Sequence, residues 1–78
     1  MDTKTKVKDV LVNLLKVKQE ELKDELSLSD SISVDSTEMV EAVIALEKAF
    51  GTKLSPKEIT KFSTINDIEK VINSKVGA

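Results

Sequence analysis

The sequence predicts an all-α domain: a four-helix bundle with three longer helices, a short third helix, and a long loop between helices 1 and 2. Apolar residues recur at helical spacing in three segments, and no segment alternates apolar and polar residues as a half-buried strand does. Residues typical of helix starts stand just before three of the four expected helices. With 78 residues, the chain is expected to form a single domain, residues 1–78, near the lower size limit for one core.

The first helix is expected over residues 4–16, because its apolar residues form one stripe at the spacing i, i+3, i+4, i+7, i+8. Residues 17–34 show no sustained period. We expect a connection whose apolar residues pack onto the core, since structureless loops of this length are uncommon. The stripe consists of Val7, Val10, Leu11, Leu14 and Leu15, and the apolar residues of the connection are Leu22, Leu26, Leu28, Ile32 and Val34.

The second helix is expected from Ser36 to Phe50, and Gly51 suits the position just after its end. Asp35 and Glu38 have the spacing of a capping box, in which each side chain accepts a hydrogen bond from the other residue's backbone N–H. Ser36 is then the first helical residue, and its hydroxyl is not needed for capping. The expected inner face consists of Met39, Val43, Leu46 and Phe50, with Val40 and Ala42 on its flanks.

The outer face of this second helix holds one apolar residue, Ile44. At about 100° per residue it projects away from the inner face, beside Thr37, Glu41 and Lys48 and near Glu47. An apolar side chain rimmed by acids, on the helix that begins at Ser36, fits a docking helix: the acids attract a partner and the apolar residue anchors it.

Two further helices are expected toward the carboxyl end. The third is short, from Pro56 to Lys61, with Ser55 as N-cap and Glu58 as its capping-box partner. The last runs from about Asn66 to Ser74. Its inner side is formed by Ile65, Ile68, Val71 and Ile72, and its start is capped within residues 64–66.

Composition excludes most catalytic chemistry. The chain contains no cysteine, histidine, tyrosine or tryptophan. It therefore has no disulfide or thiolate metal site, no imidazole ligand or general base, and no serine–histidine triad. We expect a protein that is not an enzyme and has no metal site. The polar start and the absence of a long apolar run predict no membrane span and point to the cytoplasm or an organelle matrix.

The net charge of −2 conceals an acidic middle: residues 19–50 hold nine acids against two lysines. An acidic middle, the lack of arginine and the presence of only two aromatic residues argue against a nucleic-acid partner. The natural complement of such a segment is a basic surface on another protein. A calcium-binding EF-hand loop is also excluded, because Ile32 stands at a ligand position and the loop glycine is missing.

With these residues in place, the chain resembles the acyl carrier proteins over almost its full length. The matching residues are Asp35-Ser36, Val40-Glu41, Ala45-Leu46-Glu47 and Phe50, supported by the run from Val17 to Glu21 and by Thr64-Ile65. Each short match is weak by itself. Their order and spacing in a chain of this length make the resemblance strong.

The resemblance implies a monomeric carrier with a 4′-phosphopantetheine arm on Ser36, preceded by Asp35 of the attachment motif. A phosphopantetheinyl transferase takes the arm from coenzyme A with Mg²⁺, and the arm's thiol then holds acyl groups as thioesters. The reactive sulfur thus comes with the cofactor, which accounts for the missing cysteine. The resemblance also implies acyl-loading and acyl-processing partner enzymes with basic docking patches. The implied partner contacts are acidic at Asp35, Glu38, Glu41 and Glu47, and otherwise at Thr37, Val40 and Ile44.

Three departures from the family pattern favour a specialised carrier over the housekeeping carrier of fatty acid synthesis. Ser33 replaces the usual glycine, Thr37 replaces the usual leucine, and Lys48 stands where the family often has an acid. Related lipid or secondary-metabolite biosynthesis is therefore open as the pathway. Two further functions are open as well: a carrier of aminoacyl or peptidyl groups such as D-alanine, and an unmodified helical interaction domain.

Overall fold

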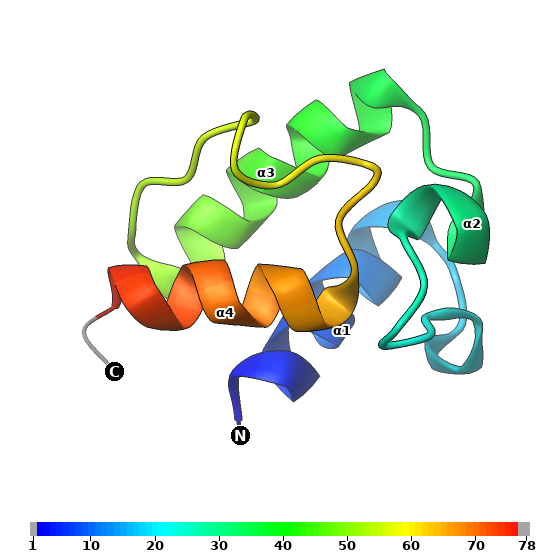
Figure 1. Cartoon of the computed structure of the whole chain (residues 1–78), viewed down its shortest axis with the longest axis horizontal. Coiled ribbons are helices and arrows are strands. Elements are labelled where there is room, and N and C mark those ends of the chain that lie inside the picture. Colours follow the sequence, from blue (N-terminus) through cyan, green and yellow to red (C-terminus); the bar gives the residue numbers. More distant parts are fainter. Residues whose placement is uncertain (1, 77–78) are drawn as a thin grey trace.

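The structure, a computed structural model, describes residues 2–76, and within them it shows helices and no strand. In chain order the elements are α1 (Thr3–Leu15), a 3₁₀ turn η1 (Gln19–Glu21), α2 (Leu28–Ile32), α3 (Ser36–Phe50) and α4 (Ile65–Lys75). Figure 1 shows their arrangement. The expected fold class, a small all-α bundle with three longer helices and one short one, is confirmed.

Helix α1 packs against both α3 and α4 and so lies at the centre of the bundle. Asp2 caps its start by accepting a hydrogen bond from Thr5 N at 2.8 Å. Val7 and Leu11 are fully buried, and the rest of the predicted stripe packs against the core from partly exposed positions. The helix ends at Lys16, whose left-handed conformation (φ 59°) lets its N–H bond to Val12 O.

The connection between α1 and α3 contains the short helix α2, which the sequence did not predict. Five residues are too few to show a helical period. Its start is nevertheless capped, because Ser27 Oγ accepts a hydrogen bond from Asp30 N at 3.1 Å. Leu22, Leu28 and Val34 are buried as expected, and Ile32 packs against the core. The expectation for Leu26 was wrong, since its side chain is exposed.

Helix α3 has the predicted bounds. Both bonds of the capping box are present: Glu38 N donates to Asp35 Oδ1 at 2.7 Å, and Asp35 N donates to Glu38 Oε1 at 3.0 Å. Gly51 ends the helix with φ 63°, a conformation in which glycine carries no steric penalty. Burial confirms the inner face except at one flank: Met39, Val43 and Leu46 are buried with Ala42, and Phe50 packs against the core from a partly exposed position. The expectation for Val40 was wrong, since its side chain is exposed.

The predicted third helix over Pro56–Lys61 was wrong in position, since this segment forms turns. A first helical turn is present, with Ile59 N donating to Ser55 O at 3.2 Å and Glu58 Oε2 accepting from Ser55 N at 3.0 Å. The helix does not continue because hydroxyl groups replace backbone partners. Thr60 N donates to Ser63 Oγ at 3.1 Å, and Phe62 N donates to Thr60 Oγ1 at 3.1 Å.

Helix α4 begins after Thr64, one residue earlier than expected, and its capping-box partner is Asp67. The side chains of Ile65, Ile68 and Ile72 are fully buried against α1 and its neighbours, and Val71 packs beside them. None of the helices within residues 2–76 has both the length and the apolar content that a membrane crossing requires.

Candidate functional site

Ser36 is exposed at the first position of α3. The two capping bonds are made by the side chains of Asp35 and Glu38, so the Ser36 hydroxyl takes no part in them. The helix start is therefore held without this hydroxyl. A group attached to Ser36 Oγ would leave the cap intact.

A groove of about 300 Å³ lies directly beside Ser36. Residues of α3 form one side, here called the helix wall, and residues of the returning segment after α3 form the other, here called the loop wall. In Figure 1 this returning segment is the yellow stretch that runs back along α3 before it enters α4. The helix wall is Ser36, Met39, Val40 and Val43, and the loop wall is Pro56, Ile59, Thr60, Lys61 and Phe62.

The groove has an apolar floor and an apolar rim. Met39, Val43 and Ile59 are buried and form the floor. At the rim Val40 is 49% exposed and Phe62 is 71% exposed. An elongated apolar group attached at Ser36 would replace water against these side chains, which is favourable in proportion to the apolar area covered.

Backbone hydrogen bonds from α2 hold the loop wall in place. Leu28 N donates to Ser63 O at 3.0 Å, and Ser29 N donates to Lys61 O at 2.8 Å. These two amides belong to the first turn of α2, where helix N–H groups lack partners within their own helix. The short helix that sequence reasoning missed therefore positions one side of the groove.

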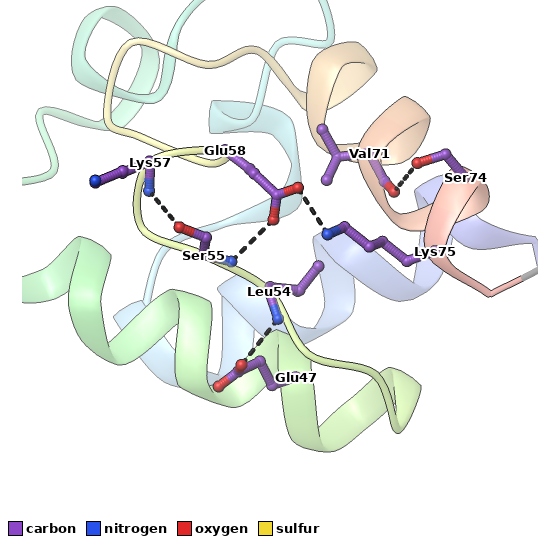
Figure 2. Close-up of polar contacts among 8 residues, drawn as sticks. All are labelled: Glu47, Leu54, Ser55, Lys57, Glu58, Val71, Ser74 and Lys75. Atoms are coloured by element: carbon purple, nitrogen blue, oxygen red, sulfur yellow. Dashed lines mark hydrogen bonds and ion pairs between the residues drawn. The ribbon is translucent and has the colours of Figure 1, made fainter.

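The beginning of the returning segment is tied to α3 by Glu47. Figure 2 shows the Glu47 carboxylate pointing at Leu54, whose N–H it accepts through Oε2 at 2.8 Å. Further along, Glu58 reaches across to Lys75 of α4, with Oε1 and Nζ 2.7 Å apart. Hydrogen bonds from Lys75 and from the Ser55 backbone hold the pKa of Glu58 below its ordinary value of 4.5.

The predicted partner residues separate into two places. Val40 lies on the rim of the groove that contains Ser36. Ile44 and Glu41 instead line a second depression, together with Leu14 and Lys48. Ile44 is 46% exposed, as expected for a residue outside the core.

The remaining predicted residues differ in exposure and in the hydrogen bonds that they make. Asp35 and Thr37 are exposed, whereas Glu38 is partly buried and takes part in the cap. Glu47 is also partly buried, and its bond to Leu54 gives it a structural role that was not foreseen. Within residues 2–76, no three acidic side chains gather closely enough to hold a metal ion.

Sequence reasoning did not assign the loop wall to the site. The only signal in the sequence was Phe62, a large apolar residue in the otherwise polar run just before the cap of α4. Its place beside Ser36 depends on the returning path of the chain, which carries no periodic pattern. The structure adds Ile59, Lys61 and Phe62 to the site.

A family model described as "Phosphopantetheine attachment site" matches residues 5–72. The match contains Ser36 and every residue that lines the groove. Domains of this description accept a covalent 4′-phosphopantetheine arm, a long and flexible group that ends in a thiol. The exposed hydroxyl and the apolar groove beside it are a physical fit for such an arm.

Proposed function

The chain belongs to the phosphopantetheine-attachment carriers of the acyl carrier protein family, and we propose that Ser36 bears the arm and that the cargo is an apolar acyl group. Members of this family carry acyl or peptidyl groups as thioesters on the arm and are generally not catalysts themselves. The thiol of the arm supplies the chemistry. The residues of this chain supply the attachment point, the groove and the docking surface.

The assignment of Ser36 as the attachment site rests on the position of this residue. It is exposed at the N-terminus of a 15-residue helix whose cap is made by Asp35 and Glu38. In the proposed reaction Ser36 Oγ attacks the phosphorus that joins the pantetheine half of coenzyme A to its diphosphate bridge. A P–O bond to Oγ forms, the P–O bond of the bridge breaks, and adenosine 3′,5′-bisphosphate leaves. The hydroxyl proton passes to a base of the transferase.

The backbone at the start of α3 favours this product. A phosphodiester on the first residue of a helix lies at the positive end of the helix dipole, where anions are stabilised. The attachment should therefore leave α3 as stable as before or slightly more so.

The lining of the groove supports an apolar acyl cargo over an aminoacyl one. Among the described residues that line the groove, the ionisable side chain is that of Lys61, which is positive, and none carries a carboxylate. The ammonium group of a D-alanyl cargo would find a like charge there and no acidic partner, which is unfavourable. An acyl chain would cover Met39, Val43 and Ile59 at no electrostatic cost.

The proposed setting is biosynthesis of fatty acids or of related lipids or secondary metabolites, in the cytoplasm, with the carrier acting as a monomer. Its partners are the transferase and the enzymes that load and process the acyl group. The exposure of Thr37, Val40, Glu41 and Ile44 supports α3 as the element that these enzymes contact. The replacement of the usual leucine by Thr37 supports partners dedicated to this carrier.

Intact-mass measurement tests this proposal. Protein purified from its own organism should carry one arm, with acyl rather than aminoacyl adducts. In a reaction with a phosphopantetheinyl transferase and coenzyme A, Ser36→Ala should show no mass increase, while the Ser29→Ala control is modified normally. Ser36→Ala should remain folded, because alanine is a good helix former and the cap is untouched. An arm on Ser36→Ala, or on Ser27, Ser31 or Ser33, would refute the assignment.

A further inference from the structure

The two walls of the groove carry charges of opposite sign. On and beside the helix wall, Asp35, Glu38 and Glu41 are negative. All of the loop wall except Phe62 belongs to a segment, residues 53–61, that holds three lysines and one glutamate. Lys61 itself lines the groove. The acidic surface of α3 therefore stops at the groove, and a basic surface begins on its other side.

The single acid of that segment does not offset its lysines at the surface. Glu58 is paired with Lys75 at 2.7 Å and accepts the Ser55 N–H at 3.0 Å. Figure 2 shows Glu58 directed toward α4 while the side chain of Lys57 extends the opposite way. The charge that this segment presents outward is accordingly that of its lysines: Lys61 lines the groove and Lys57 adjoins Pro56 of the loop wall, whereas Lys53 lies beside Gly51 at the end of α3.

Apolar side chains mark the boundary between the two surfaces. Val40 on the helix wall and Phe62 on the loop wall are the exposed apolar residues of the rim. Lys61 Nζ lies 5.4 Å from the centre of the Phe62 ring, within the range of a cation–π contact. A partner that covers this rim desolvates the lysine together with the ring. An apolar centre flanked by charged groups has the anatomy of a protein docking site.

We propose that the phosphopantetheinyl transferase that modifies Ser36 has a docking surface with charges of both signs. Its basic groups lie opposite α3, and its acidic groups lie opposite Lys57 and Lys61. The inference rests on the proposed function, since it takes Ser36 as the attachment point. An enzyme that reaches Ser36 must approach the groove, and both walls border it. A uniformly basic surface would be attracted by Glu41 and Asp35 but repelled by the two lysines. A surface of two signs is attracted by both walls and is fixed in one orientation.

Charge reversal of the loop wall tests this inference. The variant Lys57→Glu/Lys61→Glu is compared with the unchanged protein in a reaction with coenzyme A and the phosphopantetheinyl transferase of the same organism. The rate is followed by intact mass at low ionic strength. Modification of the variant should be about ten-fold slower or more, because steering by surface charge changes association rates by roughly 10–10³-fold. The difference should shrink as salt is added.

A matched control separates local contact from net charge. Lys23→Glu/Lys70→Glu changes the net charge by the same amount at two exposed positions that do not line the groove, and its rate should differ from that of the unchanged protein by less than about two-fold. Thermal unfolding of both variants shows whether either is unfolded. If the double variant does not fold, Lys57→Glu alone serves instead, with an expected slowing of about three-fold; its side chain is exposed.

The opposite results are equally decisive. An unchanged rate in the Lys57→Glu/Lys61→Glu variant would show that the loop wall is not contacted, and the inference would be overturned. A faster rate would show a uniformly basic partner, with the same consequence. If the unchanged protein itself receives no arm at Ser36, the proposed function fails. This result differs from a failure of the inference on the lysines, in which the unchanged protein is modified and the Lys57→Glu/Lys61→Glu variant is modified at the same rate or faster.

Discussion

The two walls of the groove reach their positions by different physical routes. The helix wall belongs to α3, whose capping box, apolar spacing and terminal glycine all lie within residues 35–51. The returning segment that carries the loop wall has no repeating pattern and depends on partners elsewhere: the amides of Leu28 and Ser29 in α2, the carboxylate of Glu47 in α3, and Lys75 in α4. One wall is specified locally and the other by the tertiary structure.

This difference suggests a division of roles. The proposed attachment at Ser36 requires a hydroxyl in a fixed position, and a capped helix start provides it with few demands on the rest of the fold. Entry of the proposed acyl chain into the groove requires that the loop wall can move away from the helix wall. A segment held by a few hydrogen bonds and one fully buried side chain is more easily displaced than a helix. If the loop wall is the more dependent side, substitutions at its anchors should destabilise the protein more than matched substitutions on the outer face of α3.

The largest effect is expected for Ile59→Ala. Ile59 is 1% exposed and is the buried anchor of the loop wall, so its truncation should lower the free energy of unfolding by about 2–5 kcal/mol. The matched control is Ile44→Ala on α3, where the isoleucine side chain is 46% exposed. This substitution should lower the free energy of unfolding by less than about 1 kcal/mol, because the better helix propensity of alanine offsets part of the lost contact. Urea unfolding measures both. Equal losses would mean that Ile44 contributes to the core as Ile59 does, and the assignment of Ile44 to the outer face of α3 would be wrong.

These residues also show what the sequence could and could not reveal. The burial of Met39 and the exposure of Ile44 followed from helical spacing alone, because a helix fixes the direction of each side chain. The position of Ile59 beside Ser36 did not follow. Its segment was expected to be a helix, because Ser55 and Glu58 make the local contacts of a helix start. The competing hydroxyl bonds of Thr60 and Ser63, which end the turn, cannot be told from sequence spacing.

The next effect concerns Glu47, which was expected from the sequence to attract partners and which the structure ties to Leu54 at the beginning of the returning segment. Glu47→Ala removes the acceptor of the Leu54 N–H and should cost about 1–2 kcal/mol, in the range of bonds to charged groups. Glu41→Ala, on an exposed acid of the same helix, should change stability by less than about 0.5 kcal/mol. Glu47→Gln keeps an acceptor and should recover most of the loss. The measurement is the midpoint of thermal unfolding for the three variants. If Glu47→Ala were as stable as Glu41→Ala, the bond to Leu54 would contribute nothing.

The case of Glu47 explains why the charge pattern alone was insufficient. Spacing on α3 places Glu41 and Glu47 on the outer part of the helix, and both were expected to steer partners. The chain that returns after Gly51 brings Leu54 against one of them. Since no local rule predicts which acid a returning segment will meet, the structure was needed to separate the exposed acid, Glu41, from the structural one, Glu47.

A smaller change, and a gain rather than a loss of stability, is expected for a substitution at Ser33, the residue that ends α2. Ser33 has a left-handed backbone (φ 52°), a conformation that costs a residue with a side chain roughly 1–2 kcal/mol. Ser33→Gly removes this strain but adds freedom to the unfolded chain, so a net gain of about 0.5 kcal/mol is expected. Gly51→Ala is the reverse control. Its added Cβ would meet no atom within 4 Å, so a loss of about 1 kcal/mol there would come from the backbone alone. Thermal unfolding of both variants gives the two values. A loss of stability in Ser33→Gly would show that the Ser33 side chain contributes more than its strain costs.

The smallest effect is expected from the ion pair between Glu58 and Lys75 of α4, and its contribution to stability is lost in acid. The pKa of Glu58 is lowered from its ordinary value of 4.5, first by the hydrogen bond from Lys75 and then by that from the Ser55 N–H. A lowered pKa means that the folded protein binds this proton less readily than the unfolded chain does. The resulting stability is therefore present above about pH 4.5 and is lost as pH falls below it toward the folded-state pKa. Glu58→Gln should lower the thermal midpoint slightly near pH 7, since an exposed pair contributes little, and this difference from the unchanged protein should disappear as the pH approaches 3. Thermal midpoints measured from pH 7 down to pH 3 give the comparison. If Glu58→Gln and the unchanged protein had the same thermal midpoints at every pH, the acid sensitivity would come from another group. The next residue to vary would then be Asp24, which pairs with Lys8 of α1 and whose pKa is also lowered.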